Sequence, residues 1–172
     1  MWIRTGTPHR VEIDFSQLTN EHGAAGNTGA FSGHYLLVAF GYTSCPDVCP
    51  LTLVSVHAAL QRIPDATALV PIFITVDPKR DTWQRLGNYV QSFDSRIRAF
   101  TGSEAAIAST AVAFHIEYRT QSLPGEGTYT VDHTARLFLL DPQHNVVATL
   151  PENISSHDLA DRIVRAFNEA RR

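Results

Sequence analysis

Both cysteines of the chain lie in one short stretch, which constrains the fold more than any other: Phe40-Gly41-Tyr42-Thr43-Ser44-Cys45-Pro46-Asp47-Val48-Cys49-Pro50. In a regular helix, Cys45 and Cys49 would have Cβ atoms about 5–6 Å apart, wider than the roughly 3.5–4.5 Å of a disulfide. Pro50 lacks an N–H and its ring would clash with the Pro46 carbonyl, so a helix does not run unbroken from Pro46. We therefore predict Cys45 in a turn at a strand end, Cys49 near a helix N-cap, and a helix from about Pro50.

Two thiols at the start of a helix favour either disulfide chemistry or soft-metal binding. The unpaired N–H groups of the first turn lower thiol pKa values and favour thiolates, which suit Cu(I), zinc and iron–sulfur centres. Two thiolates do not complete a metal site. Because the chain has no third cysteine, a four-thiolate site within it is excluded, and a missing ligand must be a histidine, a carboxylate or a group from a partner.

Length and composition predict one domain spanning residues 1–172. Hydrophobic residues make up 44% and charged residues 18%, which is typical of a globular protein. A formal charge of −3 leaves no basic stripe, so nucleic-acid binding is disfavoured. No apolar run reaches the roughly 18 residues of a membrane span, and the first residues lack the apolar core of a signal peptide; taken literally, the chain is expected to be soluble and unexported.

Strand and helix patterns alternate along the chain. Tyr35–Phe40 and Pro71–Val76 are continuous apolar runs, typical of strands buried on both faces. The other expected strands cover 11–18, 97–101, 116–120, 136–140 and 146–150, and the expected helices cover 50–62, 82–93, 103–114 and 155–172. Residues 19–33 and 121–132 are predicted loops, and 141–145 a hairpin turn. This order predicts an α/β sandwich with a mixed sheet, with the cysteines at the carboxyl end of their strand, where such sheets place their sites.

Two of these predictions rest on periodicity. Val11, Ile13 and Phe15 alternate with polar residues, as in a half-exposed strand. The helix over 50–62 has apolar residues on one face and on a flank, namely Leu51, Val54 and Ala58 and then Leu53, Val56 and Leu60.

Three motifs resemble the Sco/SenC family in order and spacing, over roughly residues 11–170. They are Gly41-Tyr42-Thr43-Ser44-Cys45-Pro46-Asp47-Val48-Cys49-Pro50, Thr75-Val76-Asp77-Pro78-Lys79-Arg80-Asp81-Thr82, and Val131-Asp132-His133-Thr134 followed by Leu139-Leu140-Asp141-Pro142. A Cys-x-x-x-Cys spacing alone would be weak support; three motifs in register are specific.

The resemblance implies a thioredoxin-like fold and a copper metallochaperone. Family members deliver copper to the binuclear copper site of cytochrome c oxidase, and their ligands map onto Cys45, Cys49 and His133. The implied partners are the copper-accepting oxidase subunit, a thioredoxin-like reductant and another copper chaperone. The implied location is the periplasmic side of the bacterial inner membrane, or the mitochondrial intermembrane space, through an N-terminal anchor that this chain does not show.

The ligand set fits copper chemically. Two thiolates suit Cu(I), and an imidazole with an oxygen donor lets a site accept Cu(II). Asp132 is a candidate to orient the His133 ring or to supply that oxygen, whereas Asp77 and Asp81 fit turn and cap positions equally well. None of the three aspartates is predicted as a ligand.

A thiol–disulfide oxidoreductase using Cys45 and Cys49 is the alternative. The usual redox pair is Cys-x-x-Cys, and such enzymes resemble one another in a cis-proline where this chain has Asp132-His133-Thr134. A peroxiredoxin is excluded, because that family has a threonine three residues before its reactive cysteine, where this chain has Tyr42 or Pro46. Copper binding without turnover is therefore preferred, with a disulfide form as its inactive state.

Overall fold

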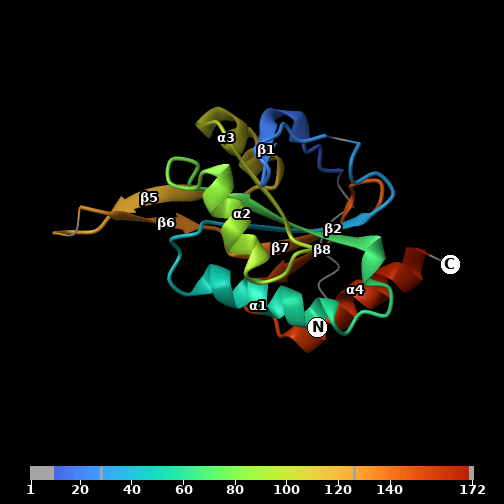
Figure 1. The fold of residues 1–172 in the computed structure, drawn as a ribbon. Coiled ribbons are helices and arrows are strands. Elements are labelled where there is room, and N and C mark those ends of the chain that lie inside the picture. The colour runs from blue at the N-terminus through green and yellow to red at the C-terminus, as the bar shows by residue number, and fades with distance from the viewer. Residues whose placement is uncertain (1–9, 28, 126, 171–172) are drawn as a thin grey trace.

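Two β-sheets and four α-helices make up the structure, a computed structural model that describes residues 10–27, 29–125 and 127–170. The main sheet has six strands in the order β1-β4-β3-β2-β7-β8, and β5 and β6 form a separate two-stranded sheet (Figure 1). The strands are β1 (Leu18–Asn20), β2 (Tyr35–Gly41), β3 (Leu69–Thr75), β4 (Arg98–Gly102), β5 (Tyr118–Ser122), β6 (Tyr129–His133), β7 (Arg136–Leu140) and β8 (Val146–Pro151). The helices are α1 (Val48–Leu60), α2 (Trp83–Gln91), α3 (Glu104–Ala113) and α4 (Ser156–Ala170), and short 3₁₀ turns cover Phe15–Gln17 and Ala66–Ala68.

Strand β2 lies inside the sheet and leads directly to the cysteines. It pairs in parallel with β3 and antiparallel with β7, and all seven of its residues are buried. A strand with neighbours on both edges and helices on both faces must be apolar throughout, which is why Tyr35–Phe40 shows no alternation. The mixed α/β sandwich predicted from the sequence is confirmed.

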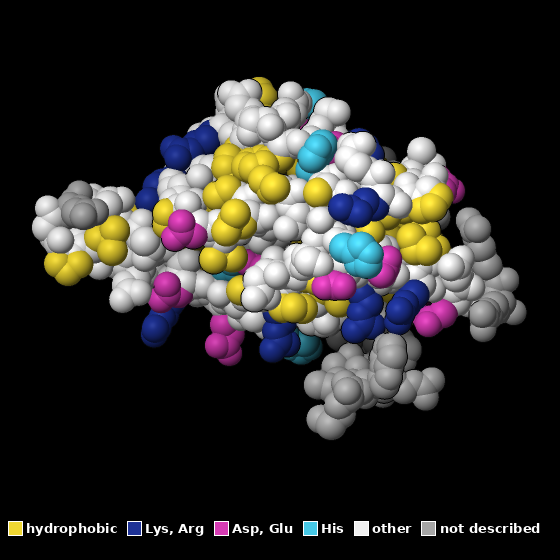
Figure 2. All heavy atoms as spheres, turned by 90° about the horizontal axis from the view of Figure 1, so that it is seen from below, with side chains coloured by type: hydrophobic (Ala, Val, Ile, Leu, Met, Phe, Trp, Pro, Cys, Tyr) yellow, Lys and Arg dark blue, Asp and Glu magenta, His cyan; other side chains and the backbone are white. Residues whose placement is uncertain are grey.

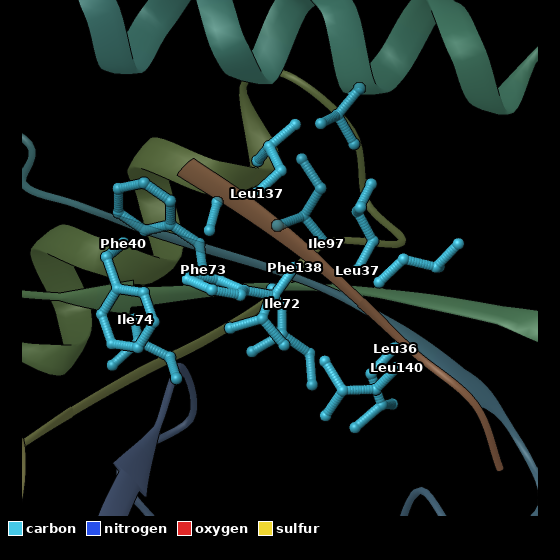
Figure 3. Packing of buried hydrophobic residues seen from close by; sticks show 14 of the residues in the cluster. Leu36, Leu37, Phe40, Ile72, Phe73, Ile74, Ile97, Leu137, Phe138 and Leu140 are labelled. Carbon is cyan, nitrogen blue, oxygen red and sulfur yellow. The ribbon is translucent and has the colours of Figure 1, made fainter. Parts of the chain in front are cut away.

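The helices cover the main sheet on both faces. Figure 1 shows α1 and α4 below the sheet and α3 above it. Phe73 of β3 contacts Tyr89 of α2, which places α2 on the face of α1. On the other face, Phe40 packs edge-on against Phe114 at the end of α3. Figure 3 shows apolar side chains from β2, β3 and β7 filling the space around the sheet.

The predicted strand over 11–18 is wrong, although its alternation is real. Val11, Ile13 and Phe15 are all buried, yet residues 15–17 form a 3₁₀ turn and only 18–20 pair, with β4. The Asp14 side chain accepts a hydrogen bond from the Ser16 N–H and starts that turn. An extended segment lying on the core shows the same period-2 burial as a strand, so the pattern did not reveal the lack of a partner.

Helix α1 begins earlier than predicted and buries the other face. It starts at Val48, with Asp47 at the N-cap, so Cys49 lies in its first turn. Leu51 and Val54 are 67% and 52% exposed, whereas the predicted flank, with Leu53 and Val56, is buried together with Cys49, Thr52, Ala59 and Leu60. Figure 2, seen from the side where α1 and α4 lie, shows hydrophobic side chains among the charged ones on this face.

The predicted loop over 121–132 is largely a β-hairpin. Strands β5 and β6 pair antiparallel from Tyr118↔His133 to Ser122↔Tyr129, and the hairpin extends away from the body of the molecule (Figure 1). The other predicted elements are present to within two residues at most ends, and the last two positions of the predicted helix over 155–172 lie outside the described residues. Thr82 and Ser103 are the N-caps of α2 and α3, each accepting a hydrogen bond from a first-turn N–H.

Candidate metal centre

The two cysteines lie where β2 ends and α1 begins. Cys45 is in the connecting turn and is partly buried, while Cys49 is only 2% exposed; both are free thiols. The last strand residue has to be glycine, because a Cβ on Gly41 would lie 2.7 Å from the Cys49 sulfur and 2.9 Å from the Phe73 ring. The sequence prediction of a strand–turn–helix junction is therefore confirmed.

The two sulfurs differ in their affinity for a proton. The Cys49 thiol donates a hydrogen bond to Cys45, and the N–H groups of Cys49, Asp47 and Val48 add to it, so the pKa of Cys45 falls to about 5 despite partial burial. The same hydrogen bond, together with burial, raises the pKa of Cys49 well above its usual value. At neutral pH the metal-free pair is thus one thiolate and one thiol. The sequence reasoning expected thiolate character at both sulfurs, and this holds only for Cys45.

His133 brings an imidazole to the buried cysteine from 84 positions away. It is the last residue of β6, and its Nε2 lies 3.9 Å from the Sγ of Cys49. Its Nδ1 lies 3.2 Å from the carbonyl oxygen of Thr134. A carbonyl only accepts hydrogen bonds, so Nδ1 donates to it, and Nε2 is the ring nitrogen that faces the sulfur.

The separation of these two atoms suits a shared metal ion. Taking zinc values of about 2.3 Å to sulfur and 2.0–2.1 Å to nitrogen, an ion could bond both atoms at an angle of about 130° across their 3.9 Å separation. Within the described residues, no three His, Cys, Asp or Glu side chains already stand together as a metal-binding group. We therefore keep Cys45, Cys49 and His133 as the proposed ligands.

The three aspartates near the motifs take structural positions. Asp132 is exposed, its Oδ2 lies 3.8 Å from the Nε of Arg119, and as the residue before His133 in β6 its side chain lies on the opposite face of that strand. Asp81 is fully buried and accepts hydrogen bonds from the Thr43 N–H and the hydroxyls of Thr43 and Thr75. It therefore ties the cysteine loop to the end of β3, and Thr82 rather than Asp81 caps α2.

Two buried polar groups beside the cysteines were not expected from the sequence. The hydroxyl of Tyr89, on α2, and Oε2 of Glu152, after β8, have no hydrogen-bond partner among the residues that the structure describes. Burial raises the pKa of Tyr89, and the nearby cysteines raise it further. Burial, and then the Cys45 charge, raise the pKa of Glu152 to about 8. Strand β8 is antiparallel to β7, and β7 is antiparallel to β2, so β8 and β2 end at the same edge of the sheet. The position of Glu152 near the cysteines follows from this topology and from no local sequence pattern.

The comparison with known proteins decides the family. The SCO1/SenC family model matches residues 4–168. The chain belongs to the SCO1/SenC family. It is 33% identical over 142 residues to Protein SCO1 homolog 1, mitochondrial, of Arabidopsis thaliana, which covers 81% of this chain and 42% of that protein.

Two solved family members with bound copper share the fold. Arabidopsis thaliana ScoI is 30% identical with a TM-score of 0.83, covering 95% of this chain and 98% of that one. Bradyrhizobium japonicum ScoI is 32% identical with a TM-score of 0.79, covering 93% and 99%. The thioredoxin-like fold predicted for this Sco-type chain is confirmed.

The chain spans about half the length of the first curated relatives it matches, 42% to 57%. None of the helices in the described residues is both long enough and apolar enough to cross a membrane.

Proposed function

We propose that this chain is a copper-binding metallochaperone, with Cys45, Cys49 and His133 as its copper ligands. The observation that carries the proposal is the approach of His133 Nε2 to Cys49 Sγ, 3.9 Å, at a junction that also holds Cys45. Two similar Sco proteins have been solved with copper bound. The two sulfurs would hold Cu(I), and the imidazole would add a ligand that Cu(II) also accepts.

The exposure of the site fits transfer rather than storage. Cys45 and His133 are only partly buried, and a surface pocket of about 450 Å³ opens beside His133. An incoming ligand from an acceptor could therefore reach the metal from the side of Cys45 and His133 while buried Cys49 still holds it. Stepwise ligand exchange of this kind allows a tightly bound ion to leave.

The proposed acceptor is the subunit of cytochrome c oxidase that carries the binuclear copper site, as the family resemblance implies. The test mixes Cu(I)-loaded protein with the metal-free, reduced copper domain of that subunit and follows the metal after separation. Net transfer that exceeds transfer from the same amount of free chelated Cu(I) supports delivery. Copper that stays with this chain, or moves no faster than from the chelator, contradicts it.

A thiol–disulfide oxidoreductase is the second candidate, favoured by the asymmetry of the two thiols. A partly exposed cysteine with a pKa of about 5 beside a buried cysteine of raised pKa resembles an attacking and a resolving thiol. The Cys45 thiolate would attack a partner disulfide, and Cys49 would then release the reduced partner and leave a Cys45–Cys49 disulfide. Rapid reduction of a model disulfide by metal-free protein, lost in Cys45→Ala, would favour this candidate.

Copper loading and delivery also imply further partners and a cellular compartment for this chain. Copper loading requires reduced thiols, so we infer a thioredoxin-like reductant and a copper donor as further partners. The Arabidopsis thaliana relative is named as a mitochondrial protein. For this chain we propose the equivalent compartment, the mitochondrial intermembrane space or the periplasmic side of a bacterial inner membrane.

A further inference from the structure

The hairpin that carries His133 depends on contacts outside its own sheet. In the described part of the chain, strands β5 and β6 pair only with each other, and four of the five residues of β5 are exposed. A two-stranded hairpin alone is marginally stable in water. The position of His133 relative to the cysteines is therefore set by whatever fixes β6 to the body of the protein.

Three residues tie the start of β6 to the loop after β3. Asp77 is buried, and its Oδ1 accepts a hydrogen bond from the Tyr129 hydroxyl at 2.7 Å. The Nε of Arg80 donates to Asp77 Oδ2 at 2.5 Å, and its Nη1 donates to the Tyr129 carbonyl at 2.9 Å. The guanidinium also lies over the Tyr129 ring, 3.7 Å from its centre.

The strand alternation extends this anchor to His133. Side chains of Tyr129, Val131 and His133 share one face of β6, because alternate residues of a strand point the same way. The N–H of Val131 donates to the hydroxyl of Tyr42 at 3.2 Å, and the Tyr42 ring stands edge-to-face with the His133 ring, 6.3 Å between centres. Arg80 also lies over Tyr42, 5.8 Å from its ring centre.

We propose that Asp77, Arg80 and Tyr129 form a clamp that positions His133 as a copper ligand. They are positioning residues, since none of them contacts the proposed metal. The clamp fixes β6 at its first residue and Tyr42 fixes it at its third, so the fifth residue, His133, meets Cys49 in a defined place. This inference rests on the proposed copper site.

The test compares variants that are matched in chemistry. Arg80→Gln removes the charge and the fork of donors, and Arg80→Lys keeps the charge but cannot make the planar two-sided contact. Tyr129→Phe removes only the hydroxyl that donates a hydrogen bond to Asp77. Arg119→Gln is the control, because Arg119 lies on the exposed outer face of the same hairpin.

The first measurement uses metal-free protein and does not depend on copper. Nuclear Overhauser effects between the ring protons of Tyr42 and His133 report the imidazole position. We expect them to weaken in Arg80→Gln, Arg80→Lys and Tyr129→Phe and to match wild type in Arg119→Gln. Unchanged contacts in all three clamp variants would overturn the proposal, whether or not the protein binds copper.

The second measurement is Cu(II) affinity, with the metal as the probe. We expect each Arg80 variant to bind Cu(II) about 10- to 100-fold more weakly, the usual effect of losing a group that orients a metal ligand. In a His133→Ala background the same Arg80 substitutions should have no further effect, because the clamp acts through His133. An equal loss of Cu(II) affinity in both backgrounds would overturn the positioning role and point to general destabilisation. Full Cu(II) affinity in Arg80→Lys would also overturn it, because the charge alone would then be sufficient. Wild-type protein that binds no copper would overturn the proposed site, and the ring contacts would still test the clamp itself.

Discussion

The thiol and the N–H of Cys49 both donate hydrogen bonds to the Cys45 sulfur, and the protonation state of each sulfur depends on the other. The Cys49 thiol is the largest cause of the lowered pKa of Cys45. In Cys49→Ala we expect the pKa of Cys45 to rise from about 5 towards the ordinary thiol value of about 8.5. Thiolate absorbance against pH, in metal-free reduced protein, measures this shift.

The reciprocal variant is the control for that titration. In Cys45→Ala, Cys49 should still titrate only in the alkaline range, because it remains buried. A Cys45 pKa that stays near 5 without Cys49 would show that the helix N–H groups alone stabilise the thiolate.

Glu152 is a buried carboxyl group that opposes folding at higher pH. Its pKa is raised to about 8, so between about pH 4.5 and 8 the folded protein keeps a proton that the unfolded chain releases. Its contribution to stability is therefore complete below pH 4.5 and is lost as the pH rises through 8. We expect Glu152→Gln to gain stability over wild type across this window, by at most about 1.4 kcal/mol per pH unit.

Urea unfolding of wild type and Glu152→Gln at several pH values measures the difference. Cys45, with its lowered pKa, changes stability in the opposite sense, but it is present in both proteins and largely cancels. Stability curves that run parallel from pH 5 to 8 would show that Glu152 is ionised in the folded state.

Among the elements, α1 carries the clearest difference between pattern and structure. Leu51 and Leu53 are the same residue type two positions apart, yet one is 67% and the other 2% exposed. Leu53→Ala should lower the free energy of unfolding by about 2–5 kcal/mol, and Leu51→Ala should change it by about 0.5 kcal/mol or less. Denaturant unfolding of the pair checks the orientation of the helix; similar losses in both variants would contradict it.

The sequence could not predict which face of α1 is buried, because the helix has apolar side chains on several faces. With Leu51, Val54, Leu53 and Val56 all apolar, periodicity gives two possible buried faces. The direction is decided by Cys49, whose sulfur packs against Gly41, a contact between elements that no local pattern shows.

Strand β6 was missed for a related reason, whereas the predicted strand over 116–120 overlaps β5. Tyr129–His133 has only one buried residue, and sequence patterns indicate burial rather than backbone pairing. The predictions that succeeded, β2, β3, α2 and β7 among them, concern segments whose burial dictates their composition.

At the scale of the molecule, the proposed site joins segments that lie far apart in the sequence. The motifs propose Cys45, Cys49 and His133 as ligands, and the structure brings His133 to Cys49 across 84 positions. Glu152, Tyr89 and the role of Arg80 depend on how distant segments meet, so local patterns could not find them. That residues 1–172 form one domain stays a prediction.

The proposed copper site holds one ion through three residues. Its most direct test is anaerobic titration of the reduced protein with Cu(I) against a competing chelator, alongside Cys45→Ala, Cys49→Ala and His133→Ala. We predict one tight equivalent in wild type, its loss in either cysteine variant, and weaker binding in a folded His133→Ala protein. Wild-type protein that fails to compete, or a His133→Ala variant with unchanged affinity, would contradict the three-ligand site.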